Sequence, residues 1–196
     1  MKLPEPIRDG KISVEKAMLE RRSVREFLET PLTLTEVSQL LWAAQGVSSP
    51  LGYRTAPSAG ALYPLEVFLV SGKVEGLPAG VYRYRAESRE LVKIADGDRR
   101  SGLCAAALEQ GAVRRAPASL VLAAVFERTI RKYGERGIRY VHMESGNASQ
   151  NVSLEAVSLG LGTVIIGAFR DGEVKKVLGL NLEEPLLIMP VGKPAR

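Results

Sequence analysis

Cysteine and histidine each occur only once in the 196 residues, as Cys104 and His142. A disulfide within the chain needs two cysteines, so a disulfide framework is excluded. A zinc site of the usual kind needs three or four Cys or His ligands, and we therefore expect no metal centre. A catalytic triad would have to use His142, which lies inside a predicted helix and is expected to be an ordinary helix or interface residue.

Long apolar runs are also missing from the chain. The longest one covers residues 118–126 and is far too short to span a bilayer. Residues 1–6 lack the apolar core of a signal peptide. We therefore expect a cytoplasmic protein without a membrane partner.

Aromatic residues are scarce, at 6% of the chain. A surface that binds RNA needs exposed aromatic side chains interleaved with cations, and Tyr82-Arg83-Tyr84 is the best patch of this kind. A basic RNA-binding protein is therefore a minor alternative, and no nucleic-acid partner is expected. The net charge is +5, from 27 Lys and Arg against 22 Asp and Glu. It fits an anionic ligand or simple solubility, and its placement decides between them.

The length and composition fit a single domain over residues 1–196, with 45% hydrophobic and 25% charged residues. Periodicity and capping signals predict helices near residues 13–23, 34–45, 98–110, 138–159 and 171–178. Short apolar or alternating runs predict strands at residues 65–70, 81–84, 90–94, 120–125, 164–166 and 186–189. Helices and strands follow no regular alternation, which predicts an α+β fold.

A cluster of cations follows the first predicted helix. Three arginines and a serine stand within five residues, in the order Arg21-Arg22-Ser23-Val24-Arg25. Guanidinium groups and hydroxyls fit phosphate oxygens, so an anion site is one interpretation. A solvated basic helix end is the other, and the local sequence alone leaves both open.

A long polar loop follows the second predicted helix. Residues 47–64 are unusually many for a loop in a compact domain, which favours a function. Small, nearly uncharged residues fill its end, in the order Ala56-Pro57-Ser58-Ala59-Gly60-Ala61-Leu62-Tyr63-Pro64. They would let backbone amides approach a flat ligand, although a plain tight loop is the alternative.

The glycines near residue 160 do not form a dinucleotide fingerprint. Gly160 and Gly162 are followed by Ile165 where that motif has its third glycine, and they follow a helix rather than a strand. A Rossmann site is therefore excluded.

Taken in order, these motifs resemble those of the nitroreductase-like FMN-dependent oxidoreductases. Residues 21–25 resemble the phosphate-binding opening of that family, and residues 57–64 resemble its Pro-Ser-loop-Pro segment. Residues 160–167 resemble its late glycine-rich strand, and residues 190–194 its last core strand. The resemblance covers nearly the whole chain. It implies a central, mainly antiparallel sheet flanked by helices, in an intertwined homodimer.

One branch, the SagB-type dehydrogenases, is the most similar. Its resemblance is carried by residues 57–64, by residues 132–140, which begin Lys132-Tyr133-Gly134, and by Gln150-Asn151. Members of this branch oxidise thiazolines and oxazolines to azoles in peptide-toxin biosynthesis. The resemblance makes Lys132 and Tyr133 the candidate catalytic pair, while a solvated loop is the alternative for that charged segment. This chain is shorter than those members, which leaves its substrate open.

The resemblance also implies FMN as the cofactor, with NAD(P)H and a small molecule as partners. Arg21 and Ser23 would bind the phosphate, with Arg22 assisting. Arg25 would lie at the pyrimidine edge of the ring, where a positive group stabilises the charge of reduced flavin. Gln110 would share that edge or stand as a polar helix end.

The remaining site residues come from the resemblance as well. Ile166 and Gly167 would place backbone N–H groups near flavin N5, where hydride arrives and leaves. Arg196 or Lys193 would add charge near the phosphate, unless the tail is frayed. The second subunit would cover the ring with Pro57, Ser58, Ala59, Gly60, Ala61 and Leu62. A flavin carrier or sensor without turnover is the alternative to an enzyme.

Overall fold

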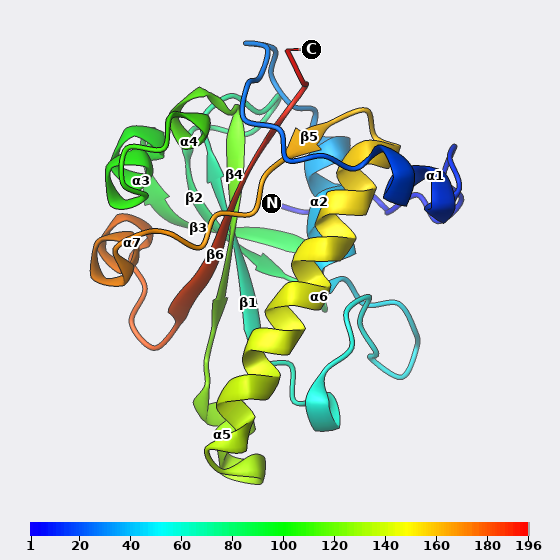
Figure 1. Ribbon diagram of the computed structural model, residues 1–196, viewed down its shortest axis with the longest axis vertical. Coiled ribbons are helices and arrows are strands. Elements are labelled where there is room, and N and C mark those ends of the chain that lie inside the picture. The colour runs from blue at the N-terminus through cyan, green and yellow to red at the C-terminus, as the bar shows by residue number, and fades with distance from the viewer. Residues whose placement is uncertain (196) are drawn as a thin grey trace.

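A six-stranded sheet forms the centre of the protein, with helices on both of its faces (Figure 1). The computed structural model describes residues 1–195. The strands are β1 (Leu65–Ser71), β2 (Gly80–Arg85), β3 (Glu90–Asp96), β4 (Ala118–Ala124), β5 (Gly162–Thr163) and β6 (Glu184–Gly192). Their order is β3-β2-β1-β4-β6-β5, and every neighbouring pair is antiparallel. The predicted α+β fold with a mainly antiparallel sheet is confirmed.

The central strands are buried because both faces of the sheet are covered. All seven residues of β4 are buried, as a continuous apolar run predicts. Leu120 in β4 lies opposite Leu69 in β1 and Met189 in β6. These three side chains belong to one apolar layer, whereas Phe68 and Val121 belong to the layer on the opposite face. The core therefore lies on both sides of the sheet.

Three helices lie on the first face: α1 (Val14–Glu20), α2 (Leu34–Gln45) and α6 (Arg136–Ser158). The predicted capping box of α2 is present, because Thr33 Oγ1 accepts from Glu36 N at 3.2 Å and Glu36 Oε2 accepts from Thr33 N at 2.7 Å. Helix α6 is the longest element and runs along the molecule, with α1 against its C-terminal part (Figure 1).

Helices α3 (Arg100–Ala106), α4 (Gly111–Arg115) and α7 (Asp171–Leu178) lie on the second face. The single helix predicted for residues 98–110 is wrong. The helix observed there, α3, ends at Ala106, and Leu108 and Glu109 then take positive φ angles of 56° and 58°. Glu109 N donates to Cys104 O, which closes a tight turn before α4. No glycine or proline marks this turn, so the helical periodicity of the sequence continues across it and predicts one helix instead of two.

Two strand predictions also differ from the structure. Residues 164–166 do not form a strand: β5 ends at Thr163, and only Ile166 forms an isolated bridge, to Ile188. The last strand continues past Pro190, which lies opposite Ser119. In addition, residues 127–133 form a helix, α5 (Glu127–Tyr133), that was not predicted.

The two tyrosines of the candidate RNA-binding patch are not exposed at the surface. Tyr82 is 3% exposed and Tyr84 is 5% exposed, because both pack into the apolar layer beneath α2 and α6. Burial raises the pKa of Tyr84 to about 12. This burial removes the feature on which the RNA-binding alternative depended.

Within residues 1–195, no helix is both long and apolar enough to cross a bilayer. In the same part of the chain, no three His, Cys, Asp or Glu side chains come together as metal ligands do.

Candidate active site

The arginine cluster is held against the edge of the sheet. Ser23 forms a parallel bridge with Thr163, and Val24 N donates to Thr163 O at 2.9 Å. The approach is possible only because residue 162 is glycine: a Cβ there would lie 2.7 Å from the Cβ of Val24. Gly162 and the arginine cluster, far apart in sequence, therefore lie side by side.

In the described part of the chain, the cations of this cluster are not paired with acidic side chains. Among the ion pairs formed by residues 1–195, none involves Arg21, Arg22 or Arg25. Arg22 Nη1 bonds only to backbone carbonyl oxygens, at 2.8 and 2.9 Å. A surface hollow of about 510 Å³ opens beside Ser23 and Arg25. The site thus combines positive charge, a hydroxyl and space for an anion.

The segment after β5 comes to the same region. Gln110 Nε2 donates to Ala168 O at 2.9 Å, so Gln110 lies beside residues 166–168. Figure 1 shows this stretch running from β5 to α7 over β6. Ile166 N donates to Ile188 O at 2.9 Å, so the Ile166 N–H is not available to a ligand. Gly167 is exposed, with open space where a Cβ would be, and this leaves its backbone as the accessible one.

The loop of residues 57–62 does not lie beside the arginine cluster but contacts α6 at Glu144. It contains a single 3₁₀ turn, Ala59–Ala61, in which Gly60 has φ 64° and Ala61 has φ 53°. Tyr63 follows with φ 46°, and its N–H donates to Ser58 Oγ at 2.9 Å. Positive φ angles at residues other than glycine are strained and cluster at functional sites.

Lys132 and Tyr133 end helix α5 and lie against this loop. A Cβ added to Gly60 would be 2.7 Å from Tyr133 Oη and 2.9 Å from Lys132 Nζ. The ring of Tyr133 also packs edge-on against Tyr140 of α6, with centroids 5.2 Å apart. The alternative of a solvated loop holds only in part: the pair is helical rather than a loop, but Lys132 is exposed and Tyr133 is half-buried.

Glu144 on α6 belongs to the same cluster and was missed. It is 4% exposed, and its Oε1 accepts from Ala59 N at 2.9 Å. Its Oε2 is buried without a hydrogen-bond partner within residues 1–195. Burial raises the pKa of Glu144, opposed by the hydrogen bond from the Ala59 N–H. Its helical spacing from Val141 and Ala148 on the buried face was the available signal.

Within one chain, the loop of residues 57–62 and the arginine cluster lie apart. Glu144 contacts the loop, whereas Ser153 and Val157 line a second hollow, which lies beside Val24 and the end of β5. Nine to thirteen residues of helix separate these levels, or about 14–20 Å at 1.5 Å per residue. Figure 1 shows η1, the turn Ala59–Ala61, and α5 towards one end of α6, with β5 at the other.

Three further residues considered from the sequence lie outside the arginine cluster and the loop. Arg196 lies outside the described residues. Lys193 is exposed near the cluster, and its carbonyl accepts from Leu28 N at 2.9 Å. His142 is exposed on α6, with its ring 5.5 Å from that of Phe126, as expected for an ordinary helix residue.

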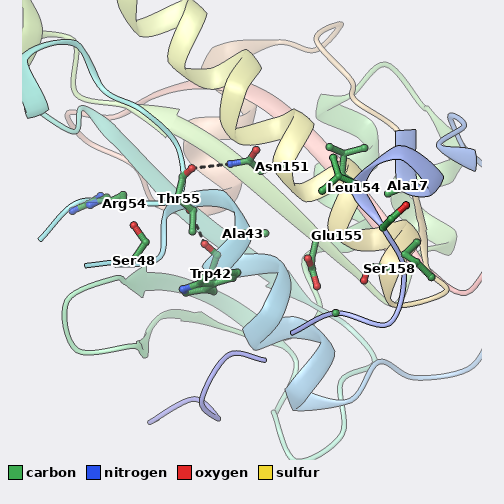
Figure 2. Close-up of a pocket in the computed structure, with 14 residues that line it drawn as sticks. Ala17, Trp42, Ala43, Ser48, Arg54, Thr55, Asn151, Leu154, Glu155 and Ser158 are labelled. Carbon is green, nitrogen blue, oxygen red and sulfur yellow. Dashed lines mark hydrogen bonds between the residues drawn. The ribbon is translucent and has the colours of Figure 1, made fainter. Parts of the chain in front are cut away.

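A separate cavity of about 500 Å³ lies between α1, α2, α6 and residues 48–55 (Figure 2). Trp42, Asn151 and Glu155 line it, and Asn151 Nδ2 donates to Thr55 O at 3.2 Å. Burial raises the pKa of Glu155. None of the predicted site residues faces this cavity.

The site can be compared with known proteins. The profile of the Nitroreductase family matches residues 18–193. A Methanocaldococcus jannaschii protein that carries the nitroreductase name is 50% identical over 182 residues, 93% of this chain and 91% of that protein. The microcin B17-processing protein McbC of Escherichia coli is 33% identical over 171 residues, 82% of this chain but 62% of McbC.

The fold gives the same answer. A Ralstonia eutropha crystal structure, also named as a nitroreductase, superposes with a TM-score of 0.87 at 32% identity. The match covers 100% of this chain and 90% of that one. With these matches over nearly its whole length, the chain belongs to the nitroreductase family and is an oxidoreductase.

Proposed function

We propose that the protein is a homodimeric, FMN-dependent oxidoreductase of the SagB-type branch, in which hydride passes between NAD(P)H or an oxidisable substrate and a small acceptor. The observation that carries this proposal is the arginine cluster of residues 21–25, of which Ser23 and Arg25 line an open hollow. A phosphate monoester fits this donor set, because guanidinium and hydroxyl groups bind its oxygens. The absence of a dinucleotide fingerprint from the sequence favours FMN over FAD.

Each residue of this half-site has a role in the proposal. Arg21 and Ser23 bind the phosphate with help from Arg22, and Arg25 stabilises negative charge at the pyrimidine edge of the ring. Gln110 holds the segment of residues 166–168 in place, and Gly167 offers the accessible backbone N–H. When bound, FMN supplies a carrier that accepts and returns a hydride.

The second half-site requires a second copy of the chain. In one chain the loop of residues 57–62 contacts α6 at Glu144, nine or more helix residues before the level at which Ser153 and Val157 lie beside Val24 and the arginine cluster. A two-fold dimer brings the loop of one subunit over the flavin of the other. Exposed apolar side chains on α1 and α6 support such an interface, with Met18 58%, Leu19 73% and Met143 55% exposed.

Lys132 and Tyr133 are the proposed proton acceptors. They lie against the loop, so they reach the same flavin that the loop covers. There, one of them would take a proton from one substrate carbon as the neighbouring ring atom gives up a hydride, so that a double bond forms between the two. The resemblance to the SagB-type dehydrogenases, which oxidise thiazolines and oxazolines, favours a heterocycle such as an azoline as the substrate class.

The purified protein tests the cofactor. We expect a yellow protein whose released flavin elutes as FMN in chromatography. Addition of NADH or NADPH should bleach the flavin spectrum, and an added quinone should restore it over many turnovers. FAD in the eluate, or no flavin binding after reconstitution, would contradict the proposal; bleaching without turnover would favour a carrier or sensor.

Light scattering tests the dimer. Wild-type protein should have twice the mass of one chain. Leu19→Asp on α1 should shift the equilibrium towards the monomer and weaken flavin binding. Leu182→Asp is the matched control, because Leu182 is 77% exposed in the turn before β6. A flavin-loaded monomer of the wild type would rule out the shared site.

A further inference from the structure

Glu144 stands out among the acidic side chains of α6. It lies on the buried face of the helix and is 4% exposed. Burying a carboxyl group there costs free energy unless its oxygens are hydrogen-bonded. One oxygen accepts the Ala59 N–H at 2.9 Å, and the other has no partner within residues 1–195. Nothing in the proposed roles of the arginine cluster or of Lys132 and Tyr133 uses this group.

The loop that Glu144 touches needs to be held. Gly60, Ala61 and Tyr63 all have positive φ angles. Such conformations persist only when the surroundings impose them. Around Tyr63 the restraints are the Ser58 hydroxyl, which accepts its N–H, and Arg128, whose Nη1 donates to its carbonyl at 3.0 Å. At the tip of the loop, the Glu144 carboxyl is the side chain that bonds the turn.

We propose that Glu144 is a positioning residue: it fixes the loop of residues 57–62 against Lys132 and Tyr133, and so sets the surface that one subunit presents to the flavin of its partner. This inference rests on the proposed function for the flavin, but the contact itself does not. Without the acceptor, the Ala59–Ala61 turn can relax away from α6. The loop and the Lys132–Tyr133 pair would then lose their common position.

The chemistry of the contact predicts which substitutions matter. The bond to Ala59 N–H needs an oxygen acceptor at the end of a side chain of this length. Glutamine supplies one without a charge, whereas leucine fills similar space and supplies none. Glu144→Leu should therefore release the turn, and Glu144→Gln should restore it.

Glu155 provides a matched control on the same helix. It is also a partly buried carboxyl whose pKa is raised by burial, but it faces the cavity of Figure 2. Glu155→Leu tests whether loss of any such carboxyl from α6 disturbs the loop.

Amide hydrogen exchange of the flavin-free protein is the direct test. We expect the peptide that covers residues 57–63 to exchange about 10-fold faster in Glu144→Leu, as for the loss of one hydrogen bond. Glu144→Gln and Glu155→Leu should match the wild type. Unchanged exchange in Glu144→Leu, or equal loss in Glu144→Gln, would overturn the proposal. If Glu144→Leu does not fold, Glu144→Ala takes its place.

Titration with FMN then tests the consequence. The dissociation constant should rise about 10-fold in Glu144→Leu and return to the wild-type value in Glu144→Gln. If the wild type binds no FMN, the proposed function fails while the exchange result still stands. If the wild type binds FMN and Glu144→Leu binds it equally well, the positioning role fails alone.

Discussion

Gly60 lies directly against Tyr133, so closely that a Cβ on residue 60 would be 2.7 Å from the tyrosine hydroxyl. The loop and the end of α5 thus fit together only with glycine at this position. Because φ at Gly60 is 64°, a side chain would be strained there even without the contact.

Gly60→Ala should therefore impair substrate oxidation more than it impairs folding. The new methyl group displaces Tyr133 or Lys132, and we expect kcat for dehydrogenation to fall at least about 10-fold, since small misplacements of reacting groups are costly. Gly52→Ala is the matched control: Gly52 has φ 81° in the same long loop, but nothing lies within 4 Å of its added Cβ. Equal effects of the two variants would mean that backbone strain alone matters.

Arg21→Ala should weaken FMN binding by about 2 kcal/mol, the scale of a lost charge-assisted contact, or about 30-fold in the dissociation constant. The fold should survive, because Arg21 is only half-buried at the end of α1. Arg85→Ala is the control, since Arg85 is exposed on β2 at a distance from the cluster. An unchanged flavin affinity in Arg21→Ala would remove this arginine from the phosphate site.

The local parts of this structure could be predicted from the sequence. Thr33 and Glu36 define the start of α2, and Gly179 marks the end of α7, because these signals act within one turn of backbone. The order of the motifs predicts the arginine cluster and the loop as site segments, and it does so from short stretches of sequence. In each case the residues that carry the signal are neighbours in the chain.

Features that depend on contacts distant in sequence could not be predicted. Pro190 continues β6 through its pairing with Ser119 of β4, a contact between segments far apart in the chain. Glu144 becomes notable only once Ala59 lies beside it, 85 residues away. Helical periodicity places Glu144 on a buried face, but it does not show which segment covers that face.

The stability of the protein should depend on pH through Glu144. Burial raises its pKa in the folded state above the ordinary value of 4.5, so folding favours the protonated form. The unfolded chain therefore ionises first, and stability falls as pH rises from 4.5 through the folded pKa, above which the cost is complete. Glu144→Gln cannot ionise and should escape this loss.

Urea unfolding at several pH values measures the effect. The two proteins should have their smallest difference in free energy of unfolding below pH 4.5, and the advantage of Glu144→Gln should grow towards neutral pH. A difference that stays constant with pH would show that the carboxyl group is not the source.

The most selective prediction concerns Lys132 and Tyr133 together. Lys132→Ala with Tyr133→Phe removes both proposed proton acceptors but leaves the arginine cluster untouched. Flavin binding and bleaching by NAD(P)H should therefore remain nearly as in the wild type. Oxidation of a substrate that must lose a proton should slow by about 100-fold or more, the usual weight of general acid–base catalysis.

The acceptor used in the assay separates the chemical role from a structural one. A quinone or nitroaromatic takes electrons from reduced flavin without needing a base for a carbon-bound proton, so its reduction should be almost indifferent to the double substitution. If substrate oxidation and acceptor reduction slow together, the pair maintains the packing against Gly60 and Tyr140 rather than moving a proton. If neither slows, the SagB-type role is wrong and the protein acts as a general nitroreductase, because the pair is then needed for neither electron transfer nor proton removal.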